Sequence, residues 1–223
     1  MGSKNKLKRF KENETFPNVI QPTREEVTTN FSLKGKWNTH FKNNNPIVLE
    51  LGCGKGEYTI ALAEKNPNKN FIGIDIKGAR FWRGAKTALE NKMPNVAFIR
   101  TQIELVDCIF SENEVDEIWI TFPDPQIKFQ RTKHRMTNST FLKKYYHILK
   151  EDGIMNLKTD SEFMHGYTLG LIHGEGHEIL HANHNVYRNG GAPEEVTSTQ
   201  TFYEKQYLEI GKPITYIRFK LKY

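Results

Sequence analysis

The sequence predicts an α/β protein built as one doubly wound domain, and three observations lead to that fold class. A short apolar run, Ile47–Leu51, passes directly into a glycine-rich turn and then into a helical pattern that starts at Tyr58. Further along the chain, apolar runs of strand length alternate with helical patterns, which is typical of a sheet covered by helices. Several of these runs end in an acidic residue, and the carboxyl ends of strands are where such sheets place ligands.

The chain divides into two predicted segments. Residues 1–45 are polar and contain turn formers at Pro17 and Pro22, so we expect a basic, partly disordered arm with a short helix near Trp37–Phe41. Residues 46–223 form the predicted domain. Its strands are expected at Ile47–Leu51, Phe71–Asp75, Val96–Ile99, Val115–Phe122, Ile154–Thr159, Glu178–Ala182 and Ile214–Lys222, and its later helices include Asn138–Leu149 and Thr201–Glu209.

The charge distribution indicates a polyanionic partner. The chain of 223 residues has a formal net charge of +6, and the cations are concentrated in two segments that contain no acid. Residues 1–11 carry five cations and residues 125–150 carry seven, whereas the rest of the chain has more acids than cations. Basic patches on an acidic body are expected for a nucleic-acid-binding protein, although a solvated charged face has the same composition.

Composition also predicts the compartment. Only two cysteines are present, Cys53 and Cys108, which favours free thiols in a reducing environment. No apolar run approaches the roughly 20 residues that span a bilayer. The basic N-terminus is not followed by the apolar segment of a secretory signal. We therefore expect a cytoplasmic protein with no membrane partner.

The glycine-rich turn narrows the class of ligand. Three glycines alternate with other residues after Glu50, the acid near the end of the first strand: Gly52, Gly54 and Gly56. A dinucleotide fingerprint, G-x-G-x-x-G, would require glycine at position 57, where the chain has glutamate, so an NAD-linked oxidoreductase is disfavoured. The E-x-G-x-G-x-G form resembles motif I of class I methyltransferases, which bind S-adenosylmethionine (SAM). Asp75 follows Gly52 by 23 residues, close to the ~20-residue offset at which an acid takes the ribose hydroxyls. A tight turn without a ligand is the alternative.

A second motif follows the fourth predicted strand. Asp124 stands between two prolines, which hold it rigidly, and a basic run extends from Lys128 to Arg135. The chain later contains Lys-Thr-Asp at 158–160 and Thr-Phe-Tyr-Glu at 201–204. In this order, the motifs resemble those of the tRNA (guanine-N7)-methyltransferases, with their P-D-P-W, basic run and T-x-[YF]-E. The resemblance covers residues 36 to about 206. The chain departs from the family pattern at Gln126, which replaces the tryptophan, and at Gln102, where an aspartate commonly meets the adenine.

The resemblance implies a Rossmann-like class I methyltransferase fold, with a mostly parallel sheet and an antiparallel C-terminal strand. It also implies methyl transfer from SAM to N7 of a guanine in tRNA, at guanine 46 of the variable loop. The residues expected to contact the cofactor are Glu50, Gly52, Gly54, Gly56, Asp75, Gln102 and Asp124, and Asp124 is also the residue assigned to the reacting centre. The residues expected to contact the tRNA are Lys128, Arg131, Lys133, Arg135, Asp160, Thr201 and Glu204.

Other functions remain open on sequence grounds. The chain could be a non-catalytic RNA-binding module on a methyltransferase scaffold, although its intact glycine motif argues against that, or a SAM-dependent methyltransferase for another RNA. Asp160 could cap the helix that begins near Ser161 instead of reading a guanine. The sequence does not decide between a monomer and a homodimer.

A histidine series is the best candidate for a metal site. It comprises His173, His177, His181 and His184. Its spacing crosses a glycine-broken helix end into a strand, and structural zinc sites usually also contain cysteines. We therefore expect no metal cofactor.

Overall fold

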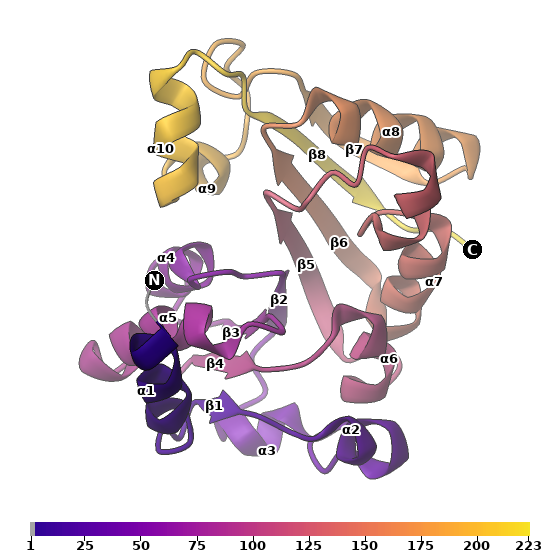
Figure 1. Cartoon of the computed structure of the whole chain (residues 1–223). Helices are drawn as coiled ribbons and strands as arrows, with labels where there is room; N and C mark the ends of the chain where they lie inside the picture. Colours follow the sequence, from indigo (N-terminus) through magenta and orange to yellow (C-terminus); the bar gives the residue numbers. More distant parts are fainter. Residues whose placement is uncertain (1–2) are drawn as a thin grey trace.

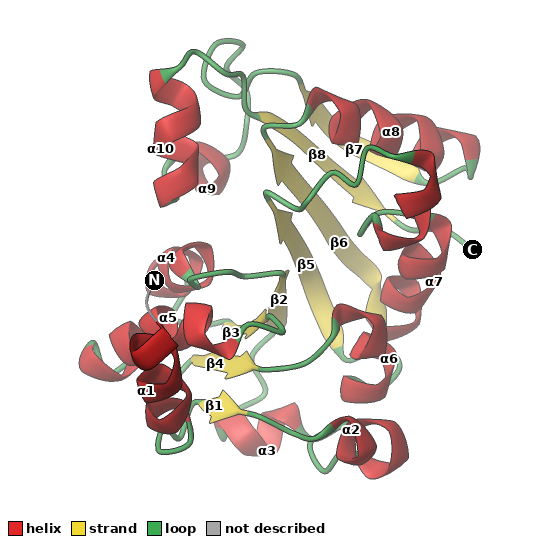
Figure 2. Ribbon diagram, in the orientation of Figure 1, coloured by secondary structure: helices red, strands yellow, loops and turns green. Residues whose placement is uncertain are grey.

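The computed structural model describes residues 3–223, with side chains described from Asn5 onward. Its centre is an eight-stranded sheet in the order β1-β4-β3-β2-β5-β6-β8-β7, with helices on both faces (Figure 1, Figure 2). All neighbouring strands pair in parallel except β8, which runs antiparallel to both β6 and β7. The predicted fold class, including the antiparallel strand at the C-terminus, is confirmed.

The elements have the following bounds. The strands are Val19–Ile20 (β1), Ile47–Leu51 (β2), Asn70–Ile74 (β3), Val96–Ile99 (β4), Val115–Thr121 (β5), Leu149–Thr159 (β6), Glu178–Asn183 (β7) and Thr215–Lys220 (β8). The α-helices are Ser3–Asn13 (α1), Arg24–Asn30 (α2), Trp37–Phe41 (α3), Glu57–Lys65 (α4), Gly78–Glu90 (α5), Val106–Ile109 (α6), Ser139–Ile148 (α7), Glu162–Gly174 (α8), Glu194–Thr197 (α9) and Phe202–Glu209 (α10). Two 3₁₀ turns, Ile103–Leu105 (η1) and Phe129–His134 (η2), complete the described chain.

Strand β2 shows how the sequence builds two cores. Successive strand residues face opposite sides of a sheet, and every residue of β2 is buried. Leu49 and Leu51 join the cluster under α3, α6, α7 and α8, which contains Trp37 and Phe110. Val48 joins the second cluster, on the side of α4 and α5. A strand that is buried on both faces usually has a continuous apolar sequence, and Glu50 is the charged exception in β2.

The chain reverses its direction of travel across the sheet beside β2. From β2 it proceeds outward through β3 to β4, and it then returns to place β5 on the other side of β2. Open α/β sheets bind ligands outside the carboxyl ends of the strands at such a switch point. The turn after β2 and the loop after β5 therefore border the position where a ligand is expected.

The N-terminal segment differs from the predicted arm. Residues 3–45 form α1, β1, α2 and α3, and β1 extends the sheet by pairing with β4. Asn13 is buried and donates to the carbonyl of Gly78, while Glu12 accepts a 2.7 Å hydrogen bond from the indole of Trp82. These long-range contacts outweigh the polar composition of the segment. The predicted short helix at Trp37–Phe41 is present as α3.

No helix in the described part of the chain is long and apolar enough to cross a membrane. Both cysteines are free thiols, with Cys53 buried and Cys108 half-buried.

Candidate active site

The turn between β2 and α4 forms the floor of the candidate site. Its three glycines all have positive φ, between 56° and 74°, a conformation that glycine adopts without strain. A Cβ at Gly54 would meet nothing closer than 4.0 Å, so this backbone is open to a ligand. A Cβ at Gly56 would lie 2.6 Å from the ring of Phe98. Gly56 therefore allows α4 to pack closely on the sheet, and it lies outside the cavities that the other two glycines line.

Glu50 holds this turn from beneath. Its carboxylate accepts hydrogen bonds from the Thr59 backbone N–H at 2.8 Å, the Thr59 hydroxyl and the Thr121 hydroxyl at 2.6 Å. It thus joins β2 to the first turn of α4 and to the end of β5. Burial raises the pKa of Glu50 to about 7, against the lowering effect of these hydrogen bonds. Glu50 also lines the small cavity above the turn, so it can orient a ligand there indirectly.

Asp75 and Gln102 lie together beside the turn. Asp75 follows β3, and its two carboxylate oxygens accept hydrogen bonds from the backbone N–H groups of Gly54 at 3.0 Å and Lys77 at 2.7 Å. Gln102 follows β4, and its side-chain oxygen accepts a hydrogen bond from Arg24, which leaves its amide N–H₂ for another partner. Both residues line a cavity of about 230 Å³ together with Gly52.

Three cavities adjoin along the carboxyl edge of the sheet. The cavity at Asp75 shares Gly52 with a cavity of about 120 Å³ above the glycine turn. That second cavity shares Arg80 and Phe122 with a third, of about 800 Å³, which we call the acceptor cavity. The first two could hold an elongated cofactor, and the third could hold the group that reacts with it.

The loop after β5 brings Asp124 to the acceptor cavity. Two non-glycine residues flank it with positive φ of 48°, Phe122 and Gln126. Such conformations are uncommon outside glycine and cluster at functional sites. The Asp124 carboxylate is exposed and accepts a hydrogen bond from the Gln126 backbone N–H at 3.2 Å. Asp124 lines the acceptor cavity, and Phe122 on the same loop lines both this cavity and the one above the glycine turn.

Asp160 reaches the same cavity from the end of β6. The neighbouring helix α8 is capped by Ser161, whose hydroxyl accepts from the Met164 N–H at 3.2 Å, so Asp160 is not the cap. The carboxylate of Asp160 instead forms an ion pair with Lys212. Asp124 and Asp160 therefore both line the acceptor cavity, as two strand-end acids should.

The basic loop divides into exposed and buried cations. The exposed ones, on or beside η2, are Lys128, Arg131 and Lys133. Arg135 is only 6% exposed, and its guanidinium lies 4.8 Å and 4.4 Å from the ring centroids of Phe163 and Tyr167. It donates to the carbonyls of Gln126 and Ile127, each at 3.1 Å. Arg135 thus fastens the loop to α8 and does not face solvent.

The motif at 201–204 is a helix cap. The Thr201 hydroxyl accepts from the Glu204 N–H, and the Glu204 carboxylate accepts from the Thr201 N–H, which is a capping box. Glu204 is fully buried and also pairs with Lys158 at 2.7 Å and accepts from the Tyr187 hydroxyl at 2.7 Å. Thr201 lines the cavity above the glycine turn.

Comparison with known proteins identifies the family. A family model described as "Putative methyltransferase" matches residues 44–217. The tRNA (guanine-N(7)-)-methyltransferase of Christiangramia forsetii is 75% identical over the whole of both chains. The chain belongs to the tRNA (guanine-N7)-methyltransferase family. The enzyme of that name from Porphyromonas gingivalis is 49% identical over 93% of this chain and 86% of its own.

A solved structure supports the fold at lower similarity. The 16S rRNA methyltransferase KamB superposes with a TM-score of 0.65 at 13% identity, covering 85% of this chain and 94% of that one. Together with the family match, this likeness confirms the predicted class I methyltransferase fold.

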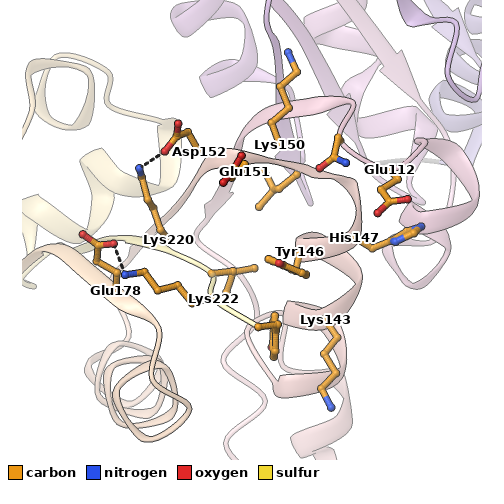
Figure 3. A pocket seen from close by; sticks show the side chains of 14 residues that line it. Glu112, Lys143, Tyr146, His147, Lys150, Glu151, Asp152, Glu178, Lys220 and Lys222 are labelled. Atoms are coloured by element: carbon orange, nitrogen blue, oxygen red, sulfur yellow. Dashed lines mark hydrogen bonds and ion pairs between the residues drawn. The ribbon is translucent and has the colours of Figure 1, made fainter.

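Another cavity, of about 790 Å³, lies at the amino end of β6 (Figure 3). Its lining includes neither the glycine turn nor the acids that follow β3, β5 and β6. Two of its lysines pair with carboxylates, since Lys220 lies 2.8 Å from Asp152 and Lys222 lies 2.9 Å from Glu178. Within residues 3–223, the structure shows no cluster of three or more histidines, cysteines or acids placed to hold a metal ion.

Several residues of this family member's site are not predicted from sequence, and among them Arg80, Tyr207 and Lys212 line the acceptor cavity. Arg80 and Tyr207 lie on helices whose partners only the fold reveals. For Lys212, the sequence does contain one signal. Gly211 precedes it, and a glycine at the end of a helix often fixes the direction of the chain that follows.

Proposed function

We propose that this protein transfers a methyl group from SAM to N7 of a guanine in tRNA, at guanine 46 of the variable loop. The observation that carries the proposal is that the cofactor cleft adjoins an acceptor cavity whose lining includes Asp124 and Asp160 and which borders a basic loop. The family to which the chain belongs supports the same reaction.

The residues of the cleft fit SAM. The open backbone at Gly54, in the cavity that Gly52 also lines, would accommodate its methionine part, and Asp75 would accept hydrogen bonds from the ribose hydroxyls. The free amide N–H₂ of Gln102 would donate to the adenine edge. When bound, SAM supplies an electrophilic methyl group on a sulfonium.

The acceptor requires no general base. Guanine N7 carries a bare lone pair and no proton, so its attack on a methyl group needs correct alignment above all. Positive charge spreads over the purine as the methyl group arrives, and the carboxylates of Asp124 and Asp160 would stabilise that charge. We assign Asp124 to the reacting centre because Phe122, on the same loop, also lines the cavity above the glycine turn.

The substrate residues follow from their exposure. Lys128, Arg131 and Lys133 are exposed on the loop and would contact phosphates, while Asp160 would accept from the guanine base after the base leaves the RNA stack. Glu204 could contact the base only if its ion pair with Lys158 and its hydrogen bond with Tyr187 broke. We therefore assign Glu204, and likewise the buried Arg135, a structural role in the site. Thr201 would contact the bound molecules directly, and its place in the lining of the cavity above the glycine turn supports this role. Two free thiols and a tRNA substrate are consistent with a cytoplasmic enzyme.

The test is a product analysis. The purified protein, SAM and an unmodified tRNA transcript are incubated, and the RNA is then digested and examined by mass spectrometry. We expect 7-methylguanosine in the fragment that contains position 46, and none in a transcript with adenine at that position. Methylation of another nucleoside, or no methylation of any tRNA, would contradict the proposal.

A further inference from the structure

The ion pair between Asp160 and Lys212 occupies the wall of the acceptor cavity. Both side chains line this cavity, and they come from separate elements, the end of β6 and the segment after α10. The side chain of Asp160 is 14% exposed and that of Lys212 is 41% exposed. Both charged groups can therefore be approached from the cavity without being free in solvent.

Lys212 is held in this position by its backbone and by a ring. Gly211 has a φ of 72°, and the backbone N–H of Lys212 donates to the Tyr207 carbonyl at 2.9 Å, which closes the end of α10. The Lys212 ammonium lies 4.8 Å from the centroid of the Tyr207 ring, a cation–π distance. The hydrogen bond to Asp160 raises the pKa of Lys212 above its ordinary value, so the ammonium stays charged.

The pair presents a pattern that matches one base. Along its Watson–Crick edge, guanine offers an acceptor at O6 and then two donors, N1–H and the 2-amino group. A carboxylate accepts two hydrogen bonds side by side, and an ammonium only donates. An acid beside a lysine therefore complements the whole edge of a flipped guanine, which is the edge that flipped bases expose for reading.

Resting on the proposed function, the geometry points to Lys212 as a specificity-determining residue that donates to O6 while Asp160 accepts from N1–H and the 2-amino group. Adenine reverses this edge: its 6-amino donor would face the lysine, and its N1 lone pair would face the carboxylate. The same ion pair that neutralises Asp160 before the substrate binds thus favours guanine and rejects adenine. When guanine enters, hydrogen bonds to the base replace part of the interaction between Asp160 and Lys212.

The test isolates the contact to O6. A synthetic tRNA carries guanosine or 6-thioguanosine at the methylated position; sulfur is a weak acceptor, while N1–H, the 2-amino group and N7 are retained. For the wild-type protein we expect kcat/KM to be roughly tenfold lower for the 6-thioguanosine tRNA than for the guanosine tRNA, which is the scale of a hydrogen bond to a charged group. This difference is counted beyond any that remains between the two tRNAs in a variant without the Lys212 ammonium. In Lys212→Met, which keeps most of the apolar stem, the two substrates should be methylated at nearly equal rates.

Lys205→Met is the matched control, because Lys205 is an exposed lysine on α10. It removes the same charge from the helix that directly precedes Lys212, and it should keep the wild-type ratio between the two substrates. If Lys212→Met slows both substrates by the same factor, Lys212 only positions Asp160 and the inference is overturned. Failure of the wild-type protein to methylate the guanosine substrate would instead contradict the proposed function itself.

Discussion

The buried pair of Lys158 and Glu204 allows a direct test of how helix α10 is held beside the site. Both side chains are fully buried, and their charged atoms lie 2.7 Å apart. The Lys158 ammonium also donates to the carbonyls of Val196 at 2.5 Å and Thr199 at 3.0 Å. Burial lowers the pKa of Lys158, and the Glu204 carboxylate opposes that shift, so the two charges depend on each other.

Removing one partner leaves the other charge buried and unpaired. We expect Lys158→Met or Glu204→Ala to lower the free energy of unfolding by about 3–5 kcal/mol each. For a chain of this size each kcal/mol corresponds to roughly 2–4 °C, so the melting temperature should fall by about 6–20 °C. The double variant should lose less than the sum of the two, because no buried charge is left alone.

The assay is thermal unfolding by circular dichroism, with methyl transfer measured well below the melting temperature. Glu209→Ala serves as the control, because Glu209 is an exposed glutamate at the end of the same helix. A Glu204→Ala variant that melts like the wild type but transfers no methyl group would refute this reasoning. That outcome would show instead that the carboxylate contacts the guanine, as the sequence motif had suggested.

Three further predictions concern the cofactor, the loop and pH. Asp75→Asn should weaken SAM binding in calorimetry by ~1–3 kcal/mol, and Asp152→Asn at the opposite edge should not; equal affinity in both variants would remove Asp75 from the cofactor site. Replacing Lys128, Arg131 and Lys133 together by glutamine should reduce the slope of log affinity for tRNA against log salt by roughly 2, with SAM binding unchanged; an unaltered slope would make the loop a solvated face. The raised pKa of Glu50, about 7 in the folded protein against about 4.5 unfolded, means that its protonated form favours folding, a contribution complete below pH 4.5 and lost as pH rises to 7. In urea denaturation, the stability of the wild type relative to Glu50→Gln should therefore fall by about 3 kcal/mol across that range; parallel pH profiles would contradict the shift.

The sequence predicted those parts of the site that depend on local pattern. The glycine turn and the acids at Asp75, Asp124 and Asp160 could be placed because each directly follows a strand, and parallel strands end at one edge. The helix Trp37–Phe41 was likewise recognisable from its residues.

What could not be predicted depends on contacts between distant segments. Residues 3–45 look polar, but their order comes from partners such as Gly78 and Trp82, far along the chain. A local signal for order is present there as well, since Thr23 and Glu26 form a capping box at the start of α2. Arg135 and Glu204 were expected to face the tRNA because both are charged and lie in the right motifs. Their burial follows from Phe163, Tyr167 and Lys158, which only the fold brings beside them.

The central claim, transfer to N7, is tested most directly by changing that single atom. A tRNA with 7-deazaguanosine at position 46 has carbon in place of N7, and it keeps the Watson–Crick edge, the shape and the phosphates. We expect no methyl transfer to this RNA, while it inhibits methylation of the normal tRNA with an inhibition constant close to the KM of that tRNA. Methylation of the 7-deaza RNA at the normal rate would show that the methyl group goes to another atom, and would contradict the account.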